Sequence, residues 1–116
     1  MNYLTDLDDL AHTLHAHART KGFYEPLEHM DDKDHIVFQL KQLAMIHSEV
    51  TEVLEAIRKQ QGGNKVTEEL ADIIIRVLDF WAFLNQSGYT LKKLSVAVNE
   101  KMETNKGRSH MHGVLG

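Results

Sequence analysis

The sequence predicts an all-α protein, and two observations support this fold class. Apolar residues recur every three or four positions through most of the 116-residue chain, which is the period of an amphipathic helix. The chain contains a single proline, and alternating runs of β-branched residues are few. We therefore expect one domain, residues 1–116, with a protomer that resembles a four-helix bundle and assembles as an oligomer.

Capping residues and glycines set the expected helix boundaries. The expected helices are a first from the cap Thr5 to before Gly22, a second from the cap Asp34 to about Lys59, a third from about Thr67 to Ser87 and a fourth from the cap Thr90 to about Asn105. His12 and His15 on the first helix are interpreted as solvated side chains, because the chain is rich in histidine generally.

The second helix carries a regular apolar stripe with a 4-3-4-3 spacing, which predicts a seam in the core. A polar line on the same helix, Lys41, Ser48 and Glu55, is expected to meet water. His47 falls within the apolar stripe, so we interpret it as a hydrogen-bonded core histidine. The stripe consists of Ile36, Leu40, Leu43, His47, Val50, Leu54 and Ile57.

The third helix is apolar on nearly every side. Between residues 70 and 84 only Asp72, Arg76 and Asp79 are polar, and their spacing places them on a single stripe. Such a helix has no face to present to water. The simplest cover for the remaining surface is another copy of the chain, so Trp81 is expected to lie in the core or in an interface.

Two acidic pairs at helical spacing are the strongest functional signal. Glu49 and Glu52 lie three apart on the second helix, and Glu69 and Asp72 lie three apart on the third. The short glycine-containing turn at residues 60–64 favours antiparallel neighbours, which would bring the four carboxylates together. Because like charges repel, the cluster favours a divalent cation with a preference for oxygen ligands, Mg²⁺ or Mn²⁺. The alternative is that these are ordinary surface carboxylates.

A basic and amide-bearing line follows on the fourth helix. Lys101, Asn105 and Arg108 are spaced at i, i+4 and i+7, and such side chains are suited to holding phosphate oxygens. The alternative is a solvated basic terminus that interacts favourably with the helix dipole.

Composition excludes several classes of function. The formal charge of −4 and the absence of a basic stripe argue against nucleic-acid binding. The absence of cysteine excludes disulfides and thiolate chemistry. The apolar runs are interrupted too early for a membrane span, and the N-terminus is unlike a secretory signal. We expect a cytoplasmic protein with no membrane partner.

Taken together, these motifs resemble the MazG-like all-α nucleoside triphosphate pyrophosphohydrolases. The similarity extends over most of the chain, from about residue 10 to residue 113. The matching segments are Lys-Gly-Phe-Tyr at 21–24, His-Ser-Glu-Val at 47–50, Glu-Leu-Ala-Asp at 69–72, and Lys101, Asn105 and Arg108 with the following His112 and Gly113.

The resemblance implies hydrolysis of a nucleoside or deoxynucleoside triphosphate to the monophosphate and pyrophosphate, in nucleotide-pool sanitising or control. It assigns Mg²⁺, with Mn²⁺ as a substitute, to Glu49, Glu52, Glu69 and Asp72. Glu49 or Glu52 would also orient or deprotonate the attacking water. The C-terminal line, Lys101, Asn105 and Arg108, would neutralise phosphate charge.

The resemblance also implies a homodimer or a dimer of dimers with sites between subunits. Phe23 and Tyr24 stand where several relatives have paired tryptophans, so base preference does not carry over. Two alternatives remain open: a phosphoribosyl-ATP pyrophosphohydrolase and a non-catalytic helical dimerisation module. A ferritin-like di-iron protein is disfavoured, because no glutamate in the chain is followed by histidine at i+3.

Overall fold

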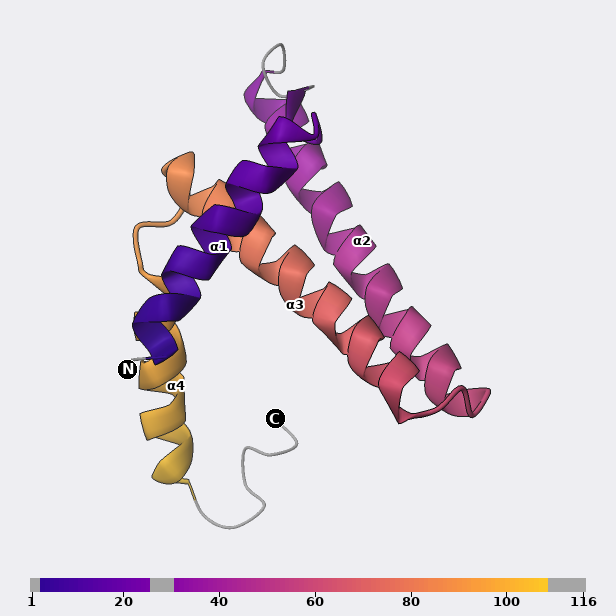
Figure 1. Ribbon diagram of the computed structural model, residues 1–116. Helices are drawn as coiled ribbons and strands as arrows, with labels where there is room; N and C mark the ends of the chain where they lie inside the picture. Colours follow the sequence, from indigo (N-terminus) through magenta and orange to yellow (C-terminus); the bar gives the residue numbers. More distant parts are fainter. Residues whose placement is uncertain (1–2, 26–30, 109–116) are drawn as a thin grey trace.

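The computed structural model describes residues 3–25 and 31–108, and within these residues it contains helices and turns but no strand (Figure 1). This confirms the predicted all-α fold class. None of the helices in this part of the chain is long and apolar enough to cross a membrane. The helices are α1 Tyr3–Thr20, α2 Asp32–Arg58, α3 Gly63–Gln86 and α4 Leu94–Lys106.

The helices α2 and α3 both begin earlier than predicted. The N-cap of α2 is Asp31 instead of Asp34, and its side chain accepts a hydrogen bond from the Asp34 backbone N–H at 2.9 Å. The turn before α3 closes at Gly62, whose φ of +97° suits glycine, and the helix begins at the next residue. Each helix start is therefore set by a residue upstream of the predicted one, Asp31 in place of Asp34 and Gly62 in place of Thr67.

The prediction that Thr90 caps the fourth helix is wrong. Thr90 belongs to the turn after α3, where its carbonyl oxygen accepts a hydrogen bond from the Asn85 side chain. The α4 N-terminus is stabilised instead by Asp8 of α1, whose carboxylate accepts hydrogen bonds from the backbone N–H and the hydroxyl of Ser95. A capping carboxylate from a distant helix leaves no trace in the local sequence, and α4 starts three residues later than expected, with Lys93 at the N-cap position.

Helix α3 is the centre of the packing. Helices α1 and α2 both pack against it (Figure 1). The chain reverses direction in the turn at residues 59–62, so α3 runs antiparallel to α2. Helix α4 packs on α1. Two apolar clusters hold this arrangement together. One contains Ala18, Tyr24, Phe38 and Phe83, with Phe80 and Leu84 packed against it; the other contains Ala11, Leu78 and Ala82, with Leu7, Leu14, Trp81 and Leu94.

The apolar stripe of α2 does not lie in the core of the protomer, and this prediction is corrected. Its six aliphatic side chains are 48–60% exposed, and His47 is exposed as well. The buried residues of α2 are Phe38 and Ala56, which lie about 200° from the stripe because each follows a stripe residue by two positions. The core of the protomer is therefore built on the opposite side of this helix.

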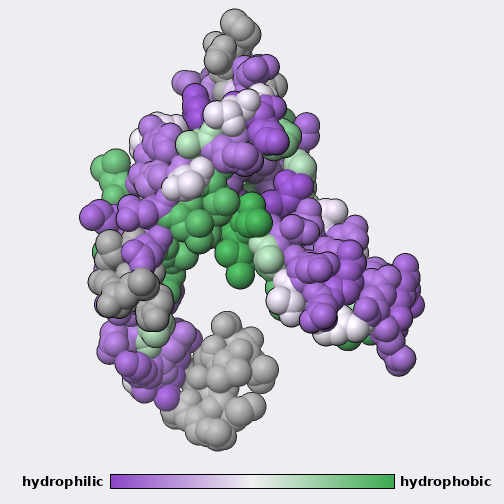
Figure 2. Space-filling view, in the orientation of Figure 1, coloured by the Kyte–Doolittle hydropathy of each residue, from purple (hydrophilic) through white to green (hydrophobic). Residues whose placement is uncertain are grey.

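The protomer is consequently open. Its radius of gyration is 16.5 Å, whereas a compact chain of this length has about 13 Å. Figure 2 shows apolar residues gathered on the inner side of the arch that the helices form. On α3, Leu70, Ile74, Ile75 and Val77 are also largely exposed. Trp81, by contrast, is half-buried and packs against the cluster that contains Ala11, Leu78 and Ala82.

Candidate functional site

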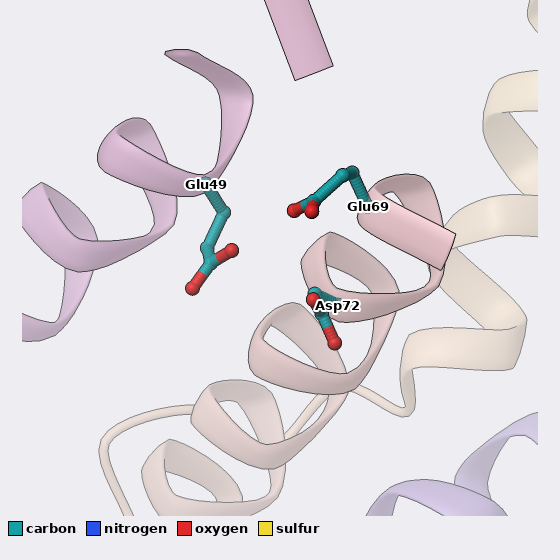
Figure 3. Close-up of side chains that lie close together, drawn as sticks. All are labelled: Glu49, Glu69 and Asp72. Atoms are coloured by element: carbon teal, nitrogen blue, oxygen red, sulfur yellow. The ribbon is translucent and has the colours of Figure 1, made fainter. Parts of the chain in front are cut away.

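Three carboxylates from two helices meet between α2 and α3. Glu49 extends from α2 into the space between the helices, and Glu69 and Asp72 extend from α3 (Figure 3). One oxygen atom from each carboxylate lies within 4.8 Å of the other two. Glu69 is buried, Glu49 is half-buried and Asp72 is exposed. The antiparallel pairing of α2 and α3 thus brings together one residue of the first acidic pair and both residues of the second.

Two basic side chains neutralise part of this cluster. Nε of Arg76 donates a hydrogen bond to Oε1 of Glu49 at 2.8 Å, and Nζ of Lys65 lies 2.8 Å from Oε1 of Glu69. The hydrogen bond to Glu69 is also the main cause of a raised pKa at Lys65. Asp72 has no ion pair with another residue in the described part of the chain.

The arrangement of the carboxylate trio Glu49, Glu69 and Asp72 fits a hard divalent cation. Mg²⁺ takes oxygen ligands at about 2.0–2.1 Å, so two ligands on opposite sides of the ion are about 4 Å apart. One oxygen atom of each carboxylate in the trio lies within 4.8 Å of the other two, which is near enough for the three side chains to share one ion. All of the donors are carboxylate oxygens, the type that Mg²⁺ and Mn²⁺ prefer.

Glu52, the fourth predicted ligand, is exposed and lies outside the carboxylate trio. It follows Glu49 by about one turn of α2 and stays in the neighbourhood of the site. Its charge contributes to the raised pKa of Lys65, after the larger contributions of Glu69 and Glu68. The structure therefore separates the predicted set into three clustered carboxylates and one solvated neighbour.

The C-terminal line does not meet the carboxylate trio within one protomer. Lys101 and Asn105 lie on α4 and Arg108 follows its end, and all three are exposed. Because α4 packs on α1, it lies well apart from the end of the molecule where α2 turns into α3 (Figure 1). The expected convergence of these side chains with the acidic cluster is absent from the protomer. His112 and Gly113 of the same motif lie outside the described residues.

A cavity of about 730 Å³ opens beside the carboxylate trio. Glu49, Asp72 and Arg76 contribute to one part of its wall, and aromatic side chains contribute to another. Tyr24 and Phe38 are buried there, whereas Phe23 is 65% exposed. The remaining lining residues are Leu14, His17, Ala18, Asp34, Val37, Lys41, Gln42, Met45, Ile75 and Asp79.

Asp79, also in the cavity wall, is the centre of a polar network that the sequence did not reveal. Its Oδ1 lies 2.8 Å from Nδ1 of His15, and its Oδ2 accepts a hydrogen bond of 2.9 Å from the Tyr24 hydroxyl. Burial and then the Asp79 carboxylate raise the pKa of Tyr24 above its ordinary range.

His15 is fully buried, so its interpretation as a solvated residue is wrong. A signal was present, because Ala11, His15 and Ala18 share the 4-3 spacing of an inward face, and all three are buried. His12 is half-buried, with its Nδ1 3.0 Å from the side-chain nitrogen of Gln86 and its ring near Trp81.

We expect Asp79→Ala to destabilise the fold more than Tyr24→Phe does. The first change leaves two buried partners without an acceptor, at about 1–3 kcal/mol for each unsatisfied group, whereas the second removes a single hydrogen bond of about 1 kcal/mol. Urea unfolding of the metal-free protein at one fixed concentration measures both changes. Equal unfolding free energies for Asp79→Ala and the wild type would show that the network contributes nothing to stability.

Comparison with known proteins identifies the family. A family model described as the MazG nucleotide pyrophosphohydrolase domain matches residues 39–109. No significant match to the chain is found among curated proteins or solved structures. The family match spans more than half of the chain and includes the carboxylate trio and the C-terminal line. The chain belongs to the MazG nucleotide pyrophosphohydrolase family, and its acidic site and cavity lie on the helices of that domain and on the segment before it.

Proposed function

We propose that this protein hydrolyses nucleoside or deoxynucleoside triphosphates to the monophosphate and pyrophosphate, with Mg²⁺ as the cofactor and Mn²⁺ as a possible substitute. The observation that carries the proposal is the position of the carboxylate trio beside a cavity with aromatic lining, with Glu49 and Asp72 in the cavity wall. A cation site and an adjoining apolar pocket match the two chemically different parts of a nucleotide. Family membership supports the same general activity.

In this proposal the carboxylates have two tasks. Glu49, Glu69 and Asp72 hold the cation, which supplies positive charge to phosphoryl oxygens. Glu52 and Glu49 are the candidates for orienting or deprotonating the attacking water. We favour Glu52 for this second task, because it is exposed at the edge of the trio and is free to face the solvent.

The cavity is proposed to hold the nucleoside. Tyr24 and Phe38 supply buried aromatic surface, with ring centroids 5.7 Å apart, and the exposed Phe23 ring is available at the rim. Aromatic side chains stack on any base, with about 1–3 kcal/mol for each stacked base. Stacking is thus a source of affinity here, whereas discrimination between bases needs polar contacts.

We further propose that the enzyme is a homodimer or a dimer of dimers, and that a second protomer completes the site. Half-exposed aliphatic side chains extend along α2 over about six turns, which is more apolar surface than monomeric proteins usually expose. The 4-3-4-3 spacing of this stripe is that of a helix that packs against another helix. A second copy would also offer its exposed α4, with Lys101, Asn105 and Arg108, to a carboxylate trio that lacks these side chains in its own protomer.

Replacing Lys101 or Arg108 by Ala is expected to weaken triphosphate binding by about tenfold, because each loses a charge-assisted contact to phosphate of about 1.5 kcal/mol. Mn²⁺ affinity in the absence of nucleotide should not change. Steady-state kinetics and calorimetric Mn²⁺ titration separate the two effects. Lys92→Ala, which removes a surface partner of Glu100 on the same segment, is the matched control. Wild-type kinetics in both variants would assign the basic line to a solvated helix end.

The function is tested most broadly by a panel of canonical and modified nucleoside triphosphates, with phosphoribosyl-ATP included, assayed for pyrophosphate release with Mg²⁺. Turnover of several triphosphates supports the proposal. Turnover of phosphoribosyl-ATP alone would favour the enzyme of histidine synthesis, and no turnover of any compound would favour a non-catalytic dimerisation module.

A further inference from the structure

Arg76 lies between the two parts of the candidate site. It follows Asp72 by four residues on α3 and precedes Asp79 by three, so the three side chains share one face of the helix. Its side chain is 38% exposed and contributes to the cavity wall, together with Glu49 and Asp72. Arg76 is therefore a basic residue of the cavity wall, next to Glu49 and Asp72 of the acidic cluster.

The hydrogen bond from Arg76 to Glu49 places a guanidinium group where a cation ligand is needed. Glu49 has the interhelical position in the trio, and its Oε1 is 2.8 Å from Nε of Arg76. A carboxylate shared with a divalent cation is a weaker partner for arginine, and the cation repels the guanidinium. Glu49 thus has two competing positive partners, Arg76 and the divalent cation.

Once it leaves Glu49, the partly exposed Arg76 guanidinium is able to bind another negative group. The planar group presents several N–H donors in a fixed geometry that matches phosphate. Arg76 lies about 6 Å from Asp72 along the axis of α3, because each of the four residues adds a rise of about 1.5 Å. This displacement is toward the aromatic lining of the cavity. In a nucleotide that extends from the trio to Tyr24, the phosphate that is attached to the sugar would lie beside Arg76.

Resting on the function proposed above, we infer that Arg76 is a substrate-binding residue that exchanges Glu49 for the sugar-proximal phosphate when the cation binds. In the absence of cation it stabilises the acidic cluster by charge neutralisation. In its presence it binds the substrate. Lys65, paired with Glu69 on the far side of the trio from the cavity lining, lies outside this exchange.

The first test measures Mn²⁺ binding without nucleotide, by calorimetry or by the electron paramagnetic resonance of free Mn²⁺. Arg76→Met removes the competing cation, so the Kd for Mn²⁺ is expected to fall about fivefold, which corresponds to about 1 kcal/mol. Arg58→Met is the control, because Arg58 makes a similar arginine–glutamate pair with Glu55 outside the trio. Unchanged or weaker Mn²⁺ binding in Arg76→Met would overturn the inference.

The second test measures product binding in the presence of Mn²⁺, with dAMP, dCMP, dGMP and dTMP in turn and with pyrophosphate. The monophosphates keep the sugar-proximal phosphate, so Arg76→Met should bind them at least about tenfold more weakly than the wild type does. Pyrophosphate affinity should stay within about twofold. An equal loss for both products, or no loss for the monophosphates, contradicts the assignment.

A second variant and a measurement on the wild-type protein complement these tests. Arg76→Gln removes the charge while keeping a polar side chain, and it should behave like Arg76→Met in both tests. If neither variant folds, the four arginine Nε–H resonances of the wild-type protein provide the measurement, and Mg²⁺ should shift one of them. Failure of the wild type to bind Mn²⁺ would refute the proposed function itself, whereas wild-type binding with unaltered variants would refute only the role of Arg76.

Discussion

Asp72→Asn is expected to lower Mg²⁺-dependent hydrolysis by at least about 100- to 1000-fold while the helical content stays unchanged. Asp72 is exposed and has no ion pair with another described residue, so its amide replacement costs little in folding. The same change removes one of three clustered carboxylates, and the charge stabilisation that a bound cation provides is worth several kcal/mol. Pyrophosphate release and far-UV circular dichroism measure the two properties.

Matched variants sharpen this experiment. Glu55→Gln changes a carboxylate of α2 that pairs with Arg58 outside the trio, and it should keep wild-type turnover. Glu52→Gln should slow turnover but leave Mn²⁺ affinity nearly unchanged if Glu52 acts on water. Mg²⁺ should also raise the Tm of the wild type, by preferential binding to the folded state, but not that of Asp72→Asn. Full activity of Asp72→Asn would remove the trio as the cation site.

Leu54→Glu is expected to dissociate the oligomer, with association weakened roughly 1000-fold. Leu54 is 58% exposed and lies near the C-terminal end of the α2 stripe. Burying such a side chain contributes about 1.5–3 kcal/mol, and a two-fold interface contains the substitution twice. Light scattering and sedimentation at micromolar concentration measure the change. Because the site is proposed to need a second protomer, hydrolysis should fall in parallel.

Ala16→Glu is the control for this prediction. Ala16 is exposed on α1, on the side away from the buried residues Ala11, His15 and Ala18, so the added carboxylate should leave assembly unaffected. Ile74→Glu on α3 should behave like Leu54→Glu, because Ile74 is 55% exposed. A wild-type protein that is monomeric, folded and active at micromolar concentration would contradict the oligomer proposal.

Most of the secondary structure was predictable from the sequence because helical periodicity and turn residues are local properties. The number of helices, the turn between α2 and α3 and the central place of α3 all follow from patterns within single segments. The start of α4 was not predictable, since its cap comes from Asp8 on a helix far away in the sequence. A capping interaction of this kind is visible only once the tertiary contacts are known.

The face of α2 was the main error, and its cause is physical. A helix with two apolar faces does not reveal which one packs within its own chain, and the more regular stripe was assigned to the core. The structure places Phe38 and Ala56 in the protomer and leaves the regular stripe outside. Hydrophobic periodicity indicates burial against something, but it does not distinguish an intramolecular neighbour from a second copy.

The candidate site was predictable only in part. Glu49, Glu69 and Asp72 were indicated by their spacing, because the turn forces α2 and α3 to run antiparallel. The pairing of Arg76 with Glu49 and the buried contact of His15 with Asp79 depend on side chains from different helices. Such pairs carry no spacing signal of their own, so the sequence identified the residue types but not their partners.

The central claim is that the carboxylate trio binds a divalent cation, and a crystal grown with Mn²⁺ tests it most directly through anomalous scattering. We expect an anomalous peak in contact with oxygens of Glu49, Glu69 and Asp72, with the Arg76 guanidinium withdrawn from Glu49. The account is contradicted if the peak lies elsewhere, or if no peak appears while Arg76 and Lys65 stay paired with Glu49 and Glu69.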